Sequence, residues 1–518
     1  MSRRKHSRRK TVQSMAQAGS AAPAEVKGKQ RRHGGGGRRP SPAAAGGLPP
    51  AVVPAPAAPA YGRGLPLLHP HAAGIDVGSF SHWVCVGPEQ GPREFPAHTD
   101  GLQALVAWLH QQQVSTVALE STGIYWVALY ELLESAGFEV LLADPSYTRQ
   151  VKGRPKSDRL DCQWIQRLHA HGLLAAAFRP DEGTCVLRSL LRLRANHVRY
   201  AGQHIQHMQK ALEQMNLKLP EVVSDITGAT GLAIIQDILR GQRDPVTLAR
   251  HRDRRCKNSA AAIAQALHGS YRDEHLFALQ QALDCWQFYQ QQLRAVDGRI
   301  EQQLHAMKKR QELPHLPTKP RQRKRKPNEP RFDVRLALYH VTGVDLTEIE
   351  GIDVVTALTV VSEIGIDMTR WPTVKHFTSW LGLCPQFRKT GGRVSSSRTR
   401  PGSNRAAGAL KLGASTLCRN KGALGAFYRR MKSRLGAPKA VTATAHKLAR
   451  LVYNTLRYGR EYVKRTQEEY EAQMHTRQVQ SLKRKARLLG LEVVERPAAS
   501  AGASASASGE DTSARAEA

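Results

Sequence analysis

Short apolar segments alternate with amphipathic ones between residues 72 and 178. Apolar or alternating runs bounded by turn residues indicate strands, which we expect at 74–78, 82–86, 93–97, 114–120 and 138–143. Apolar residues recurring every three or four positions indicate helices, which we expect at 101–112, 124–136 and 158–171. The order βββαβαβα predicts an α/β domain with a mixed sheet, in which the first and fourth strands lie side by side.

Helical periodicity dominates the rest of the ordered sequence. Between residues 184 and 310 it is strongest from Leu187 to Met215 and from Leu276 to Met307. Two such helices indicate a coiled-coil hairpin or a dimerisation arm, but without a clean heptad ordinary helix packing is equally open. Residues 332–475 are expected to be mainly α-helical. There Gly351 precedes a small-residue helix, in a turn that fits either phosphate binding or an ordinary joint between helices.

Charge distinguishes these ordered regions from the segments between them. The 518 residues contain 77 Lys or Arg and 43 Asp or Glu, a formal net charge of +34 that favours a phosphate-rich partner. Residues 1–40 contribute +11 and residues 308–331 contribute +8, so we expect most of the net charge on flexible arms. These arms and the Ala/Ser-rich end of the chain contain too few apolar residues to fold. The expected divisions are 1–71, 72–183, 184–307, 308–331, 332–475 and 476–518.

Composition also excludes several classes of protein. No run approaches 18 apolar residues, so no membrane-spanning helix is expected, and no apolar run follows the basic start as in a secretory signal. The seven cysteines show no Cys-x-x-Cys spacing. A disulfide framework and a structural zinc site are therefore not expected, and a reducing compartment fits.

Four acidic residues of the α/β region stand where a metal site would need them. Asp76 lies inside an apolar strand, where an unpaired carboxylate is costly to bury, and Glu120 ends the fourth strand. Asp158 and Asp161 are three residues apart on the last helix, so they share a face. The expected strand order brings these acids to one end of the sheet.

Converging carboxylates need cations, and ligands that are all oxygen favour Mg²⁺ or Mn²⁺. Two such ions can hold the attacking and leaving oxygens of a phosphodiester. Each acid taken alone is as typical of a helix cap or of an exposed surface. The four in this order favour a metal-dependent site.

These acids lie in motifs that carry a resemblance: Gly74-Ile75-Asp76-Val77, Glu120-Ser121-Thr122-Gly123-Ile124-Tyr125 and Lys156-Ser157-Asp158-Arg159-Leu160-Asp161. The second half adds Gly351-Ile352, Leu381-Gly382-Leu383-Cys384-Pro385, Gly391-Gly392-Arg393 and Asn404-Arg405-Ala406-Ala407. Over about residues 72–470 the chain resembles the DEDD transposases of bacterial insertion sequences, relatives of Piv-type DNA invertases that use a bridge RNA. The resemblance implies an RNase H-like (RuvC-like) domain, a coiled-coil segment and a C-terminal transposase domain.

The resemblance also implies a hydroxyl nucleophile that works with the metal-bound acids. Most relatives have a serine just before the glycine pair, and this chain has Thr390 there. A threonine hydroxyl can do the same chemistry, although its methyl group crowds the attack. Three nearby serines are alternatives: Ser395, Ser396 and Ser397. Without the resemblance, the Gly-, Ser-, Thr- and Arg-rich segment around Thr390 also fits a flexible basic loop. The residues expected to contact nucleic acid are Gly351, Arg388, Lys389, Gly391, Gly392, Arg393, Arg398, Arg400 and Arg405.

The most specific function that fits these features is DNA cleavage and strand transfer by a transposase with a covalent protein–DNA intermediate. One alternative is an RNase H-like or junction-resolving nuclease that uses water, and another is an inactive nucleic-acid-binding derivative. The expected partners are donor and target DNA, a guide RNA and further copies of the chain in a dimer or tetramer, without a membrane. The expected location is the bacterial cytoplasm, at the nucleoid.

Overall fold

The computed structural model describes residues 65–121, 123–144, 157–307, 325–326, 328–402, 404–459, 476 and 479–494. These residues do not include most of the two expected basic arms, 1–40 and 308–331. They also do not include the Ala/Ser-rich end of the chain. The elements below belong to the compact unit Leu67–Ala518.

The N-terminal part of this unit is a mixed five-stranded sheet with the order β3-β2-β1-β4-β5. Its strands are β1 (Ala72–Val77), β2 (Ser81–Cys85), β3 (Arg93–Pro96), β4 (Thr116–Glu120) and β5 (Glu139–Ala143). Its helices are α1 (Thr99–Gln111), α2 (Trp126–Ser135) and α4 (Asp158–Ala170). β1 pairs antiparallel with β2 and parallel with β4. The mixed sheet and the pairing of the first and fourth strands are thus confirmed.

Alternation along β1 assigns the helices to opposite faces of the sheet. Ala73 and Ile75 belong to one apolar core together with Leu105 of α1 and Leu129 of α2. Gly74 points the other way, because successive residues of a strand face opposite sides. A Cβ atom on Gly74 would lie 2.1 Å from the backbone nitrogen of Gln166 in α4. The sheet therefore lies between α1 and α2 on one face and α4 on the other.

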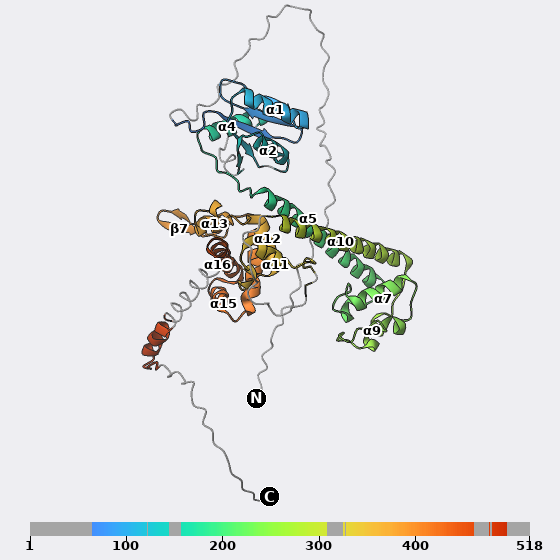
Figure 1. Ribbon diagram of the computed structural model, residues 1–518. Coiled ribbons are helices and arrows are strands. Elements are labelled where there is room, and N and C mark those ends of the chain that lie inside the picture. The colour runs from blue at the N-terminus through green and yellow to red at the C-terminus, as the bar shows by residue number, and fades with distance from the viewer. Residues whose placement is uncertain are drawn as a thin grey trace, which may run out of the picture. The chain divides into compact units, whose positions relative to one another are not determined.

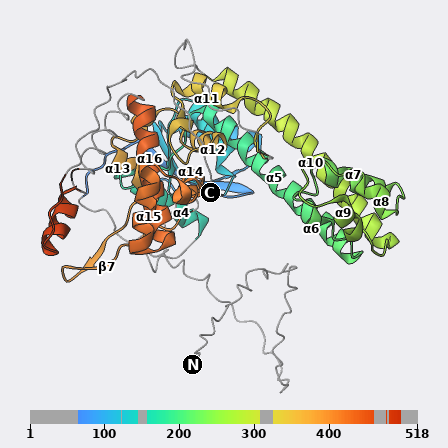
Figure 2. The same ribbon diagram turned by 90° about the horizontal axis from the view of Figure 1, so that it is seen from below.

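Two long helices follow, α5 (Glu182–Gln214) and α10 (Asp273–Ala306). They are antiparallel, because Gly183 contacts Gln303 near one end whereas His204 stacks on Tyr289 farther along. Figures 1 and 2 show them side by side. The two long helices are confirmed, and coiled-coil packing between them stays a prediction.

A small bundle closes the far end of this helical hairpin. It consists of α6 (Leu219–Val222), α7 (Ala229–Leu239), α8 (Pro245–Ala249) and α9 (Ala260–Ala266). Its core joins Ile234, Ile235 and Ile238 of α7 to Leu212 of α5 and Leu279 of α10. The tip thus has an apolar core of its own.

The C-terminal part is mainly helical, as expected. It contains α11 (Val334–Thr342), η1 (Leu346–Glu348), α12 (Val354–Ile364), η2 (Met368–Arg370), α13 (Val374–Trp380), β6 (Arg388–Thr390), β7 (Arg393–Ser396), α14 (Arg405–Thr416), η3 (Leu417–Arg419), α15 (Ala423–Leu435) and α16 (Ala437–Tyr458). Its core includes Leu187 of α5 and Ile300 of α10. The base of the helical hairpin and the C-terminal helices therefore share one core.

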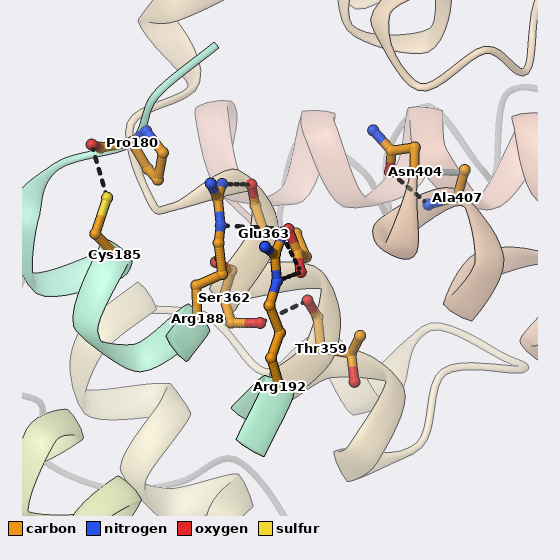
Figure 3. Close-up of polar contacts among 9 residues, drawn as sticks. All are labelled: Pro180, Cys185, Arg188, Arg192, Thr359, Ser362, Glu363, Asn404 and Ala407. Carbon is orange, nitrogen blue, oxygen red and sulfur yellow. Dashed lines mark hydrogen bonds and ion pairs between the residues drawn. The ribbon is translucent and has the colours of Figure 1, made fainter. Parts of the chain in front are cut away.

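Charged contacts reinforce this junction, as Figure 3 shows for α5 and α12. Arg192 donates to the carboxylate of Glu363 at 2.9 Å, and Arg188 donates to the Glu363 main-chain oxygen at 2.7 Å. Inside the hairpin, the buried side chains of Arg194 and Asp297 pair at 2.6 Å. Arg194 also donates to the main-chain oxygen of Asn328 at 3.0 Å, so the end of the expected linker is tied to the hairpin.

All seven cysteines are free thiols, which agrees with the spacing argument. Within the described part of the chain, no helix combines the length and apolar character needed to cross a membrane.

Candidate active site

Asp76 and Glu120 lie at neighbouring strand ends. The parallel register pairs Ile75 of β1 with Leu119 of β4, and the next residue on each strand is the acid. Adjacent strands lie about 4.8 Å apart, so the register places the two backbones side by side. Both acids are half-buried. The sheet thus brings together two residues that are 44 positions apart in the sequence.

The other two acids begin α4. Ser157 caps this helix by accepting a hydrogen bond from the Leu160 nitrogen at 3.3 Å, which makes Asp158 the first helical residue. Asp161 follows on the next turn and is half-buried, whereas Asp158 is exposed. Negative charge in the first turn is favourable, because the helix dipole is positive there.

α4 runs antiparallel to β1, and Gly74 permits their close approach. Gln166 donates from Nε2 to the Ala72 oxygen at 3.2 Å, and one turn earlier the Cys162 oxygen lies over Gly74. Continuing in this direction leads to Asp158 and Asp161, at the end of β1 that carries Asp76. A glycine inside a strand, such as Gly74, indicates close approach of another backbone. The sequence analysis did not use this signal.

The Cys162 thiol reports on the electrostatics beside Asp76. Burial first, and then the nearby Cys85 thiol and Asp76 carboxylate, raise the pKa of Cys162 to about 12. The thiol therefore keeps its proton at neutral pH. The candidate ligands from the sequence at this end of the sheet are the four carboxylates.

Carboxylate chemistry fits Mg²⁺ or Mn²⁺, because both prefer oxygen ligands. Among the described residues, which include all four acids, no three His, Cys, Asp or Glu side chains lie close enough to hold one ion. The structure therefore brings the acids to one end of the sheet without closing a ligand set. Their role as metal ligands stays a prediction.

The stretch around Thr390 forms a β-hairpin, in place of the flexible loop that the sequence left open. Thr390 of β6 pairs with Arg393 of β7, and Gly391 and Gly392 connect them with φ angles of 55° and 74°. Two consecutive left-handed residues are typical of a type I′ turn, which matches the twist of a hairpin. The turn presents the Thr390 side chain, which is exposed, beside the glycine pair.

The alternative nucleophiles lie farther from the turn. Ser395 and Ser396 line a cavity of about 580 Å³ together with Gln386, Arg388, Arg398, Thr399 and Pro401. Ser395 donates to the Arg388 main-chain oxygen at 3.0 Å, and Ser396 accepts from the Arg398 nitrogen at 3.3 Å. Ser397 is exposed. The hairpin thus separates Thr390 from a pair of serines that already have hydrogen-bond partners.

The cations expected to bind nucleic acid surround this hairpin. Exposed side chains are presented by Arg388, Lys389, Arg393, Arg398 and Arg400. The guanidinium of Arg400 also lies 3.4 Å from the Asp144 carboxylate. Arg405 is exposed at the start of α14, where Asn404 accepts from the Ala407 nitrogen at 3.0 Å (Figure 3). Their contacts with nucleic acid stay predictions.

The Gly351 turn packs against the rest of the C-terminal part. Gly351 has a φ of 86°, and a Cβ atom there would lie 3.0 Å from Leu417 and 3.1 Å from the Gly413 oxygen. A close approach to α14 and η3 is therefore a sufficient reason for glycine at this position. Phosphate binding by the turn stays a prediction.

Two family models match the chain in ranges that hold these features. Residues 73–217, with the sheet and the four acids, match the DEDD transposase model of the IS110 type, described as "Transposase". Residues 345–429, with the Gly351 turn and the hairpin, match "Transposase IS116/IS110/IS902 family". The search of the curated proteins found no match. Together the two matches show that residues 73–217 and 345–429 are domains of the IS110 transposase family.

Proposed function

We propose that the chain cuts DNA and joins the cut strand to a new site through a covalent intermediate. The observation that carries this proposal is the β1–β4 register, which sets Asp76 beside Glu120. The packing of α4 on Gly74 directs Asp158 and Asp161 to the same end of the sheet. This is the arrangement from which a carboxylate site for phosphodiester chemistry can form.

Asp76, Glu120, Asp158 and Asp161 would hold Mg²⁺ or Mn²⁺. Such ions, when bound, stabilise negative charge on the attacking and leaving oxygens. The half-buried position of three of these acids limits access of water to their carboxylates. The exposed cations of the hairpin would hold the phosphate through charged hydrogen bonds.

Thr390 is the proposed nucleophile. Its hydroxyl loses a proton, its oxygen forms a bond to phosphorus, and the bond from phosphorus to a deoxyribose oxygen breaks. The leaving oxygen takes up a proton, so the step conserves both charge and the number of phosphoester bonds. A target-strand hydroxyl then reverses the exchange and releases the threonine. The type I′ turn supports this role, because the two glycines leave the Thr390 hydroxyl accessible.

The hairpin has to reach the four acids, and we propose that it does so in a dimer or tetramer. A guide RNA would select the DNA sites. The protein would cut and join DNA at the bacterial nucleoid, in the cytoplasm. The formal net charge of +34 supports both nucleic-acid partners.

The decisive experiment traps the covalent intermediate. The protein is incubated with Mg²⁺, its RNA and end-labelled donor DNA, and the products are separated on a denaturing gel. We expect a labelled adduct whose tryptic peptide contains Thr390. Cleavage without an adduct would support the nuclease that uses water, and would contradict this proposal.

Hairpin variants identify the nucleophile. Thr390→Ala should abolish the adduct, whereas Thr390→Ser should retain it, because the hydroxyl is kept and the crowding methyl group is removed. Ser395→Ala and Ser396→Ala are matched controls in the same hairpin and should still form the adduct. An adduct mapped to either serine, with Thr390→Ala active, would overturn the assignment.

The acids are tested separately from DNA affinity. Asp76→Ala, Glu120→Ala, Asp158→Ala and Asp161→Ala should each abolish cleavage and leave DNA binding largely intact, because affinity comes from Lys and Arg. Recombination at the wild-type rate by any two of these variants would show that the metal site lies elsewhere.

A further inference from the structure

A long part of the C-terminal region contains no acidic residue. Between Asp367 and Glu461 the sequence has no Asp or Glu, and residues 368–459 contain 19 Lys or Arg. Soluble surfaces normally mix both signs of charge, which limits repulsion between neighbours. This folded region alone thus holds a large part of the net charge that we had expected mainly on the flexible arms.

Several of these cations lie on α15 and at the start of α16. α15 buries Leu424, Gly425 and Tyr428. Exposed side chains are contributed by Arg429, Arg430, Lys432, Arg434 and, in α16, Lys439. We call these five residues the α15 surface. The 13 residues of α15 extend over about 20 Å.

Arg429 and Arg430 make contacts that orient them without cancelling their charge. Arg429 donates to the main-chain oxygen of Asn420 at 2.5 Å. The Arg430 guanidinium and the Lys447 ammonium both approach the Phe427 ring, at 5.6 Å and 4.7 Å from its centre. A carbonyl oxygen or an aromatic ring fixes a cation in place but carries no net negative charge.

Helix electrostatics account for only some of the α15 surface. Lys432 and Arg434 lie in the last turn, where the helix dipole favours cations. Arg429 and Arg430 lie before that turn, so the helix dipole stabilises their charge less. Glu350 approaches Gly422, at the opposite end of α15. A polyanion that displaced solvent counterions from this surface would gain affinity from the charge.

We propose that the α15 surface binds the phosphate backbone of duplex DNA beside the bond that reacts. The choice of DNA rests on the proposed function. Leu424 of α15 and Leu383, just before the hairpin, belong to one apolar core, so the surface and the hairpin are parts of the same folded region.

The aromatic residues of α15 favour a duplex over a single strand. Tyr428 is buried and Phe427 lies under two cations, so neither ring is free to stack on an unpaired base. Contacts from Lys and Arg to phosphate do not depend on base sequence. The α15 surface therefore adds affinity for DNA without adding sequence specificity.

The test is the salt dependence of binding by the full chain. Each phosphate contact changes the slope of log K against log salt by about 0.9. A variant with Arg429→Gln, Arg430→Gln, Lys432→Gln and Arg434→Gln should therefore show a slope shallower by about 3 to 4 on duplex DNA. Arg430→Gln alone should change it by about 1. Thermal unfolding of each variant is measured alongside.

A matched control removes the same charge from exposed positions of the helical hairpin and its tip: Arg250→Gln, Arg254→Gln, Arg294→Gln and Arg299→Gln. We expect this control to keep the wild-type slope on DNA. An unchanged slope in the α15 variant, an equal change in the control, or a change confined to an RNA duplex would each overturn the proposal. Binding is measured without cleavage, so an absent Thr390 adduct would refute the proposed chemistry and leave this test valid.

Discussion

Replacing Gly74 by alanine should separate α4 from β1 and impair the candidate active site. The new Cβ atom would lie 2.1 Å from the Gln166 nitrogen, 2.5 Å from the Gln166 Cα and 2.6 Å from the Cys162 oxygen. Optimal contacts between such atoms are about 3.5 Å, so α4 has to move by more than about 1 Å. All three neighbours are backbone atoms, which cannot yield by changing a rotamer.

Overpacking of this kind usually costs about 1 to 3 kcal/mol. The larger consequence is for activity, because α4 carries Asp158 and Asp161 beside Asp76. A displacement of about 1 Å at a catalytic group can lower the rate by about 100-fold. We therefore expect Gly74→Ala to lose cleavage more severely than it loses stability.

Urea denaturation and the cleavage assay measure these two effects. Gly87→Ala is the matched control, because a Cβ atom on Gly87 meets nothing within 4 Å. The control should resemble the wild type in both measurements. Wild-type stability and cleavage in Gly74→Ala would refute the claim that close packing of α4 on β1 positions the acids.

Three further predictions concern buried groups. Asp297→Asn should destabilise the fold by about 3 to 5 kcal/mol in urea denaturation, because it leaves the buried guanidinium of Arg194 without its charged partner; stability equal to the wild type would contradict this. Burial first, and then His69, lower the pKa of His169 from 6.5 to about 4. The unfolded chain therefore binds this proton at higher pH than the folded chain, so the melting temperature should fall as pH drops from 6.5 to 4, and less steeply in His169→Gln. Cys162, whose pKa is raised to about 12, should escape alkylation of the native protein at pH 8 while half-buried cysteines react, as peptide mass spectrometry would show.

Local pattern was sufficient for the elements of the N-terminal sheet. Alternating apolar positions and turn residues mark its five strands, and the βββαβαβα order led to the β1–β4 pairing that the structure confirms. The small-residue helix expected after Gly351 is α12 (Val354–Ile364). The strands and helices were accessible because their periodic patterns depend on residues close together in sequence, and the pairing was accessible because the order of the elements limits how the sheet can form.

Long-range packing decided the features that were missed. The small bundle at the tip of the helical hairpin depends on contacts from α7 to α5 and α10. The shared core at the hairpin base joins Leu187 to residues more than 100 positions away, such as Leu338. Such contacts have no periodic signature, because each requires two distant segments to meet.

For the candidate site, the sequence by itself determined the residue types: four carboxylates, a hydroxyl beside two glycines, and many cations. The sequence left the hairpin turn unidentified, although two glycines in succession tolerate its positive φ angles at little cost. Only the tertiary structure decided that α4 lies directly on Gly74, that Ser395 and Ser396 line a cavity, and that the cations of α15 are exposed. The physical reason is that chemistry belongs to individual side chains, whereas distance and exposure are set by how separate elements pack.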